Sequence, residues 1–226
     1  MYSTHIVVKE TDLQILTDRP IDVKFVTERI RLYRWQIENY ISKDRRFNTS
    51  LKPISVELGA PAVVKEMSKA AKIVNVGPMA AVAGAIAQAV GSDLLKEGYG
   101  EVIVENGGDI FLKVKETRSV GIYANKNNIF NNLSLKIRPS DTPLGICASS
   151  GRVGHSLSFG NADSVIVLAK NAGLADAAAT ATGNLVKSAQ DFKKALAFIQ
   201  SIKGIKGCVI ILKNNLASRG KIEFSR

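Results

Sequence analysis

The sequence predicts an α/β (α+β) domain in which helices cover a mixed β-sheet. Three observations lead to this fold class. Apolar residues recur at three- and four-residue steps in a long segment near the N-terminus, which indicates an amphipathic helix. Short apolar runs bounded by turn residues dominate the middle of the chain and indicate strands. The two patterns do not alternate strictly, so a parallel βαβ array is not expected.

The first half of the chain is predicted to form a hairpin followed by three helices. Apolar runs at residues 5–9 and 13–17 flank a polar turn, which is typical of a hairpin at a sheet edge. Helical spacing covers residues 23–42. A second helix is expected from Pro61 to Val74 and a third from Pro78 to Glu97, because proline fits the first turn of a helix.

The second half is predicted to contain six strands, two helices and two final strands. The six strand-like runs lie at residues 101–105, 109–114, 119–123, 133–137, 144–148 and 164–168. The helices are expected at 174–187 and 191–202, and the last strands at 207–212 and 221–224. Since no internal repeat or linker interrupts this order, residues 1–226 are expected to form a single domain.

A stripe of small residues runs along the predicted third helix. Ala80, Gly84, Ala87 and Gly91 share one face. Glycine inside a helix costs about 1 kcal/mol relative to alanine, so a compensating contact is expected. Either another element packs closely against the stripe, or a ligand lies against the start of the helix, where free N–H groups favour anions.

Composition limits the function classes. Thirty-one Lys and Arg residues against 20 Asp and Glu give a net charge of +11, which favours anionic ligands. The basic residues are dispersed and only 6% of residues are aromatic, so nucleic-acid binding is not expected. The two cysteines suit free thiols in a reducing compartment. The most apolar run, Pro78–Val90, is shorter than the roughly 20 residues that cross a bilayer, so no membrane association and a cytoplasmic location are expected.

The first candidate segment is Asn106-Gly107-Gly108-Asp109, between two apolar runs. Asn-Gly at this place is a strong hairpin signal, because both residues accept a positive φ. The two glycines also leave the backbone open to a ligand and place a carboxylate beside it. Both interpretations stay open on this segment alone.

The second candidate segment, Cys147–Ser156, concentrates hydroxyls, glycines, Arg152 and His155 within ten residues. Such a loop can offer N–H groups, hydroxyls and a guanidinium to phosphate oxygens, and His155 is the candidate acid or base. A surface turn rich in serine and glycine is the alternative. No Gly-Lys-Ser/Thr follows, so the loop is not of the Walker type.

The third candidate segment is an alanine-rich helix in which Asp176, Thr180 and Asn184 recur at four-residue steps and share one face. Asp176 and Thr180 supply hard oxygen ligands of the kind that Mg²⁺ prefers. The alternative is that the helix dipole favours Asp176 and that Thr180 bonds back to its own helix.

Taken in order, these segments resemble the ApbE family of flavin transferases. The whole chain is similar to a branch of ApbE-related proteins found in archaea and some bacteria. The residues that carry the resemblance are Gly77-Pro-Met-Ala-Ala-Val-Ala-Gly84, Glu105-Asn-Gly-Gly-Asp109, Ser149-Ser-Gly151, Gly154-His-Ser156, Gly160-x-Ala-Asp163 and Leu174-Ala-Asp-Ala-Ala-Ala-Thr-Ala-x-Gly-Asn184.

The resemblance implies a flavin nucleotide held near a bound Mg²⁺, with its FMN half transferred to a threonine of a target protein. Asp176 and Thr180 match the family's metal-binding pair, and Gly107, Gly108 and Asp109 match its flavin-contacting turn. With them we expect Asn106, Ser149, Ser150, Gly151 and Ser156 to bind the cofactor and His155 to act as the catalytic group.

The chain also departs from the flavin transferases. A Lys-Gly-Tyr-Ala-like stretch is replaced by Met79-Ala-Ala-Val82, and a longer His-Ile-x-Asp-Pro-x-x-Gly segment shrinks to His155-Ser-Leu-Ser-Phe-Gly160. An N-terminal flavin-binding element rich in Ser and Asp is not recognisable. Transfer of FMN therefore does not follow from the resemblance.

We accordingly expect an ApbE-like protein that binds a small anionic ligand, a flavin or another nucleotide, with Mg²⁺ as the candidate metal. The site would combine Asn106–Asp109, Ser149–Ser156 and Asp176–Asn184. If the protein is an enzyme, the sequence favours a transferase-like reaction on a nucleotide or another phosphate-containing ligand. The alternative is a non-catalytic accessory or redox-partner protein, linked through the related branch to sulfur assimilation and homocysteine formation. A protein partner and a homo-oligomer are compatible with both.

Overall fold

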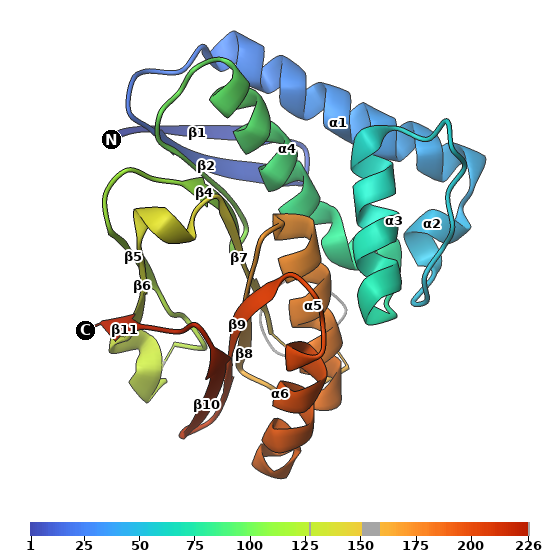
Figure 1. The fold of residues 1–226 in the computed structure, drawn as a ribbon. Helices are drawn as coiled ribbons and strands as arrows, with labels where there is room; N and C mark the ends of the chain where they lie inside the picture. Colours follow the sequence, from blue (N-terminus) through green and yellow to red (C-terminus); the bar gives the residue numbers. More distant parts are fainter. Residues whose placement is uncertain (127, 151–158, 226) are drawn as a thin grey trace.

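A large antiparallel sheet organises the molecule (Figure 1). The computed structural model describes residues 1–126, 128–150 and 159–225. The sheet has eight strands in the order β1 (Tyr2–Val8), β2 (Thr11–Thr17), β3 (Val102–Asn106), β4 (Asp109–Lys113), β7 (Leu144–Ser149), β8 (Ser164–Ala169), β9 (Ile205–Leu212) and β10 (Asn215–Gly220). A second sheet has three strands in the order β11 (Phe224–Ser225), β6 (Ser134–Ile137) and β5 (Arg118–Gly121).

Helices cover one face of the large sheet, and the small sheet packs against the other (Figure 1). The α-helices are α1 (Val23–Lys43), α2 (Arg46–Thr49), α3 (Ala62–Val74), α4 (Val82–Lys96), α5 (Ala172–Leu185) and α6 (Phe192–Gln200). Short 3-10 turns lie at η1 (Pro78–Ala81), η2 (Ile129–Asn132), η3 (Pro139–Asp141) and η4 (Ala189–Asp191).

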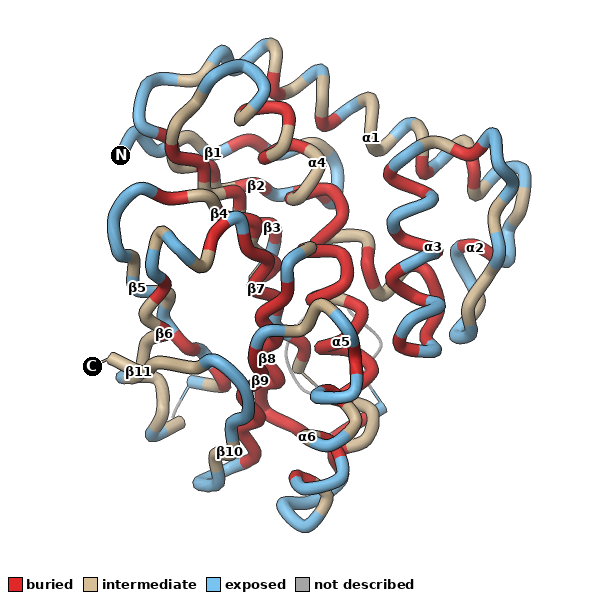
Figure 2. The backbone as a smooth tube through the Cα atoms, in the orientation of Figure 1, coloured by how far each residue is buried: buried red, intermediate tan, exposed pale blue. Residues whose placement is uncertain are grey.

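The two faces of the large sheet bury two separate apolar cores (Figure 2). Side chains alternate along each strand, so Phe111 joins the helix-side core and Leu112 the core beneath the small sheet. In the same way Cys147 lies on the helix side and Ile146 on the other. This alternation places Asp109, two residues before Phe111, on the helix side.

The predicted α/β class, with helices covering a sheet, is confirmed. One detail differs: within the described residues all the strand pairs of the large sheet are antiparallel, where a mixed sheet was expected. The reason is that hairpins join β1 to β2, β3 to β4 and β9 to β10, while the helical connections return the chain to an antiparallel neighbour.

Most predicted elements form where the sequence placed them, with two differences. The expected helix from Pro78 is divided into η1 and α4. At the C-terminus a strand was expected over residues 221–224, but the chain forms β10 before it and the short β11 at its end. Strand β10 escaped prediction because it is an edge strand that is largely exposed and lacks a buried apolar face.

Helix α4 belongs to the helix-side core. In the described part of the chain, one segment, Pro78–Lys96, is long and apolar enough to cross a membrane. In its most apolar window, 56% is buried inside the molecule. Because α4 packs against β3, β4, α1 and α5, its apolar character is accounted for by packing. The single domain over residues 1–226 stays a prediction, which the presence of strands from both ends of the chain in one sheet supports.

Candidate functional site

The turn between β3 and β4 has the tight geometry that its sequence predicts. Asn106 and Asp109 are paired across the hairpin, and Gly107 and Gly108 between them have φ values of 63° and 97°. Such values favour glycine and give a two-residue turn that matches the twist of the strands. No atom outside the turn lies within 4 Å of the position where either glycine would carry a Cβ. The turn is therefore a hairpin and also leaves its backbone accessible.

Behind this turn lie two aspartates from separate elements, one buried and one half-buried. Asp109, at the start of β4, is 7% exposed and is paired with Cys147 of β7. Asp176 projects from α5, and its Oδ2 accepts a hydrogen bond from the backbone N–H of Gly84 at 3.0 Å. Asn106 holds the same stretch of α4, because its Nδ2 donates to the carbonyl oxygen of Ala83 at 3.1 Å.

Burial makes both carboxylates weak acids. It raises the pKa of Asp176 to about 7, although N–H groups of Gly84 and Ala83 favour the ionised form. The pKa of Asp109 is raised well above its usual value, first by burial and then by the negative charge of Asp176. The two groups therefore resist being ionised together unless a positive charge joins them.

One carboxylate oxygen of this pair has no hydrogen-bond partner. Asp109 Oδ1 is buried and unpartnered within the described residues. A buried acceptor without a donor costs roughly 1–3 kcal/mol, so its place in the fold needs a reason. A divalent cation is a suitable partner, because Mg²⁺ prefers carboxylate oxygens and its charge would favour the ionised forms of both aspartates. The residues present thus fit a small hard cation.

Small residues allow α4 and α5 to approach closely enough to form the pair. A Cβ on Gly84 would lie 2.4 Å from the carbonyl oxygen of Ala172 and 2.9 Å from Asp176 Cβ. A Cβ on Gly91 would lie 2.1 Å from the ring of Phe111. Close packing therefore accounts for the glycines of the small-residue stripe, and the N–H of Gly84 binds a side chain of the protein.

Cavities lie on both sides of the β3–β4 turn. One of about 260 Å³ opens between the two sheets and is lined by Gly107 and Gly108 together with Ser149 and Ser150 at the end of β7. Another of about 440 Å³ lies on the helix side, next to Asn106, and is lined by residues of α1, η1, α4 and the β1–β2 turn. The predicted cofactor-binding residues that the structure describes thus line one or the other cavity or, like Asp109, lie behind the turn.

Comparison with known proteins places the chain in a family. Residues 2–222 match the family model described as "AbpE bacteria". The chain belongs to this family. The UPF0280 protein of Methanococcus aeolicus is 38% identical over 98% of this chain and 91% of its own length. The UPF0280 protein of Methanosarcina acetivorans is 38% identical over 96% of this chain and 86% of its own length.

Solved structures share the fold of this AbpE bacteria family member. The flavin transferase ApbE from Vibrio cholerae superposes with a TM-score of 0.63 at 16% identity, covering 96% of each chain. The ApbE protein from Thermotoga maritima gives a TM-score of 0.64 at 12% identity, covering 97% of each chain. These superpositions confirm the predicted ApbE-like fold. At sequence identities this low, they carry information about the fold alone.

The structure describes some of the predicted site residues, and the others lie outside the described residues. The structure brings the Asn106–Asp109 turn and Asp176 to the same end of α4. Ser149 lies on the strand that carries Cys147, and its hydroxyl is buried without a partner among the residues that the structure describes. The predicted residues Gly151, His155 and Ser156 lie outside the described residues, as does Arg152.

The three polar residues that share one face of α5, Asp176, Thr180 and Asn184, differ in their contacts. Thr180 is buried one turn beyond Asp176. The Oδ1 of Asn184 accepts a hydrogen bond from the N–H of Phe159 at 2.8 Å, so this part of its amide is committed to the protein. The metal-binding assignment of Asp176 and Thr180 stays a prediction.

Two participants of the site lie in segments that the sequence singled out, but neither was among the predicted site residues. The N–H of Gly84 holds Asp176, and Cys147 lies beside both carboxylates. Burial, and then the charges of Asp109 and Asp176, raise the pKa of the Cys147 thiol well above its usual value, so the sulfur stays protonated. Its Sγ donates to the carbonyl oxygen of Ala172 at 3.2 Å. The register that pairs Cys147 with Asp109 could have been anticipated only from the strand pairing.

Proposed function

We propose that the protein binds a flavin nucleotide together with Mg²⁺, which the carboxylates of Asp109 and Asp176 hold. The observation that carries the proposal is the unpartnered Oδ1 of Asp109, buried beside a second carboxylate. A bound Mg²⁺ would neutralise the charge of both aspartates and of the nucleotide's phosphates. The hydroxyl of Thr180, on the same face of α5, is the third candidate ligand.

The helix-side cavity suits the ring system of such a ligand. Its lining combines apolar side chains of Ile37, Met79 and Ile86 with the polar groups of Arg34 and Asn106. The Nε of Arg34 is buried without a hydrogen-bond acceptor within the described residues. A ring carbonyl of the ligand would satisfy this donor, while the apolar side chains would cover the ring faces.

The turn between β3 and β4 suits the phosphates of the nucleotide. Gly107 and Gly108 line the cavity between the sheets and carry no side chain that would keep a ligand away from the backbone. Phosphates lying at this turn would be close to the Asp109–Asp176 pair and its cation. The chain's net charge of +11 favours the approach of an anionic ligand.

The relationship to ApbE structures supports the choice of a flavin over other nucleotides, because one solved neighbour is a flavin transferase. The proposal concerns binding; for a transferase-like reaction, the candidate acid or base is His155, which lies outside the described residues. An accessory protein that binds the same ligand without turnover would use the same residues. A cytoplasmic location, a protein partner and a homo-oligomer remain predictions.

The proposal is tested by titrating FAD against the protein and following flavin fluorescence, with Mg²⁺ and with a chelator. We expect Mg²⁺ to tighten FAD binding by at least about tenfold, which corresponds to about 1.4 kcal/mol. Asp109→Asn and Asp176→Asn should each remove this Mg²⁺ dependence, since they keep the shape of the side chain and remove its charge.

The matched control is Asp22→Asn. Asp22 caps α1 at an exposed position, and asparagine is an equally good N-cap, so the fold should be unaffected. The control should bind FAD as the wild type does. Equal FAD affinity with Mg²⁺ and with chelator in the wild-type protein would contradict the role of the cation, and no FAD binding at all would contradict the flavin.

A further inference from the structure

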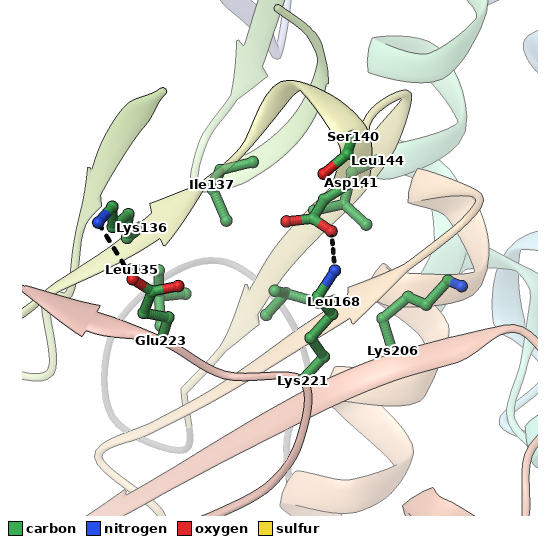
Figure 3. A pocket seen from close by; sticks show the side chains of 10 residues that line it. All are labelled: Leu135, Lys136, Ile137, Ser140, Asp141, Leu144, Leu168, Lys206, Lys221 and Glu223. Carbon is green, nitrogen blue, oxygen red and sulfur yellow. Dashed lines mark hydrogen bonds and ion pairs between the residues drawn. The ribbon is translucent and has the colours of Figure 1, made fainter. Parts of the chain in front are cut away.

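A third cavity lies away from the turn, on the face of the large sheet that packs against the small sheet (Figure 3). It has a volume of about 140 Å³ and opens between β6 and η3 on one side and β9 and the segment before β11 on the other. Its sheet-side residues Leu144 and Leu168 belong to the core beneath the small sheet, whereas Asp109 faces the helices. We propose that this cavity binds a small apolar carboxylic acid.

The floor of the cavity is apolar, and Ser140 and charged side chains line the rest of it. Leu135 and Ile137 come from β6, and Leu144 and Leu168 come from neighbouring strands of the large sheet. All four are at most 4% exposed. Such a floor favours a hydrocarbon group on the part of the ligand that lies against it, while the polar part of the lining faces the ligand's polar end.

The mouth of the cavity carries an excess of positive charge. Figure 3 shows Lys136 paired with Glu223, with 3.1 Å between Nζ and Oε1, and Lys221 paired with Asp141. Both acidic groups are therefore already engaged. Lys206 also lines the cavity, beside Lys221, and forms no ion pair within the part of the chain that the structure describes. An anionic group at the mouth would give Lys206 a partner.

The volume limits the size of the ligand. An engineered apolar cavity of about 150 Å³ in another protein binds benzene, so a cavity of about 140 Å³ takes one aromatic ring or a short branched chain. A nucleotide is far too large. An apolar body of this size with one negative charge at its end describes a small aromatic or branched aliphatic carboxylate, for which benzoate and 3-methylbutanoate are convenient probes.

The test follows the methyl resonances of leucine and isoleucine by NMR during titration with benzoate, 3-methylbutanoate and the neutral benzyl alcohol. We expect the two acids to shift the methyl signals of Leu135, Ile137, Leu144 and Leu168, and benzyl alcohol to bind more weakly. Lys206→Gln should weaken the binding of both acids about three- to fivefold, as the loss of one partly exposed ion pair predicts, and leave benzyl alcohol unaffected.

Three further variants sharpen the result. Lys203→Gln removes an exposed lysine that does not line the cavity and should bind the acids as the wild type does. Leu168→Phe fills the cavity and should abolish binding; should it fail to fold, Lys206→Gln still decides. Asp176→Asn should leave acid binding unchanged, which separates this site from the proposed flavin site.

The proposal is overturned if neither acid shifts these methyl signals, or if a folded Leu168→Phe protein still binds them. It is also overturned if Lys206→Gln binds the acids as tightly as the wild type and benzyl alcohol binds equally well, because the charge would then have no role.

Discussion

Asp109 and Asp176 lie in the interior beside the Cys147 thiol, where the surroundings disfavour two negative charges at once. The fold nevertheless supplies N–H donors from α4 to Asp176, and Oδ1 of Asp109 has no partner in the part of the chain that the structure describes. A structural role alone would be served better by a pair of amides or apolar groups. The arrangement supports the proposal that a cation completes the site.

The raised pKa of Asp176, about 7, predicts how the stability of the metal-free protein varies with pH. In the unfolded chain this carboxyl has an ordinary pKa of about 4. The native state therefore loses stability as pH rises from about 4 to about 7, since ionisation favours the unfolded chain, and the loss is on the order of a few kcal/mol. Asp176→Asn cannot ionise and should lack this loss.

Urea unfolding of both proteins at pH 5 and pH 8, in the presence of a chelator, measures the effect. The variant should gain stability relative to the wild type on going from pH 5 to pH 8, and adding Mg²⁺ should restore the wild type at pH 8. Parallel changes in the two proteins would mean that Asp176 is an ordinary acid in the native state.

At the scale of secondary structure elements, the contact between α4 and α5 sets the position of Asp176. The two helices can approach each other this closely only because Gly84 has no side chain. Gly84→Ala should destabilise the protein by about 1–3 kcal/mol through overpacking, although alanine favours a helix more than glycine does.

The control for Gly84→Ala is Gly59→Ala, because nothing lies within 4 Å of the added Cβ and the backbone there is not left-handed. Chemical unfolding should show a loss for Gly84→Ala and little change for Gly59→Ala. Equal stability of Gly84→Ala and the wild type would show that α4 and α5 can separate without cost.

A partly buried ion pair joins α1 to α4. Asp93 accepts hydrogen bonds from Tyr33 and from Arg29, whose Nε lies 2.6 Å from Asp93 Oδ2. Burial alone raises the pKa of Asp93, but the donors from Tyr33 and Arg29 outweigh it and leave the pKa below its usual value. Asp93→Ala should cost about 1–3 kcal/mol of stability, because Arg29 and Tyr33 lose their acceptor.

Lys96→Ala is the matched control for Asp93→Ala. Lys96 also pairs with Asp93, at 3.3 Å, but its side chain is 76% exposed, so its loss should change the free energy of unfolding by less than about 0.5 kcal/mol. Similar losses for both variants, measured by urea unfolding, would contradict a special role of the buried contacts.

How much of these elements the sequence predicts depends on the strength of their patterns. The hairpin of β1 and β2 and helix α1 were predicted because their apolar residues repeat regularly and their ends carry turn residues or caps. Strand β10 was not, because an exposed edge strand needs no such repeat. The division into two sheets was not predicted either, since pairing partners depend on the tertiary fold and not on the strand's own sequence.

The candidate site, too, could be predicted only in part. The order of the motifs placed Asp109 and Asp176 in one predicted site, and the structure brings the two carboxylates close together, with Asp176 bound at the start of α4. The helix-side cavity could not be predicted, because its lining is assembled from segments between Glu10 and Asn106 that have no common motif. The contact of Cys147 with the aspartates depends on the register of β4 and β7.

At the scale of the whole molecule, ligand binding should appear as increased thermal stability. A ligand present at about 100 times its dissociation constant stabilises the native state by about 2.7 kcal/mol. For a protein of this size, this corresponds to a rise in Tm of about 5–10 °C. Thermal unfolding with FAD and Mg²⁺ together should show this rise in the wild type and not in Asp176→Asn. A rise of equal size in the variant would place the ligand elsewhere.

The most direct test of the central claim is a crystal structure grown with Mn²⁺, which replaces Mg²⁺ and scatters anomalously. The anomalous difference map should show a peak bonded to Asp109 Oδ1 and to a carboxylate oxygen of Asp176. A well-ordered structure at high Mn²⁺ concentration with no anomalous peak between these two side chains would contradict the claim that the pair holds a divalent cation.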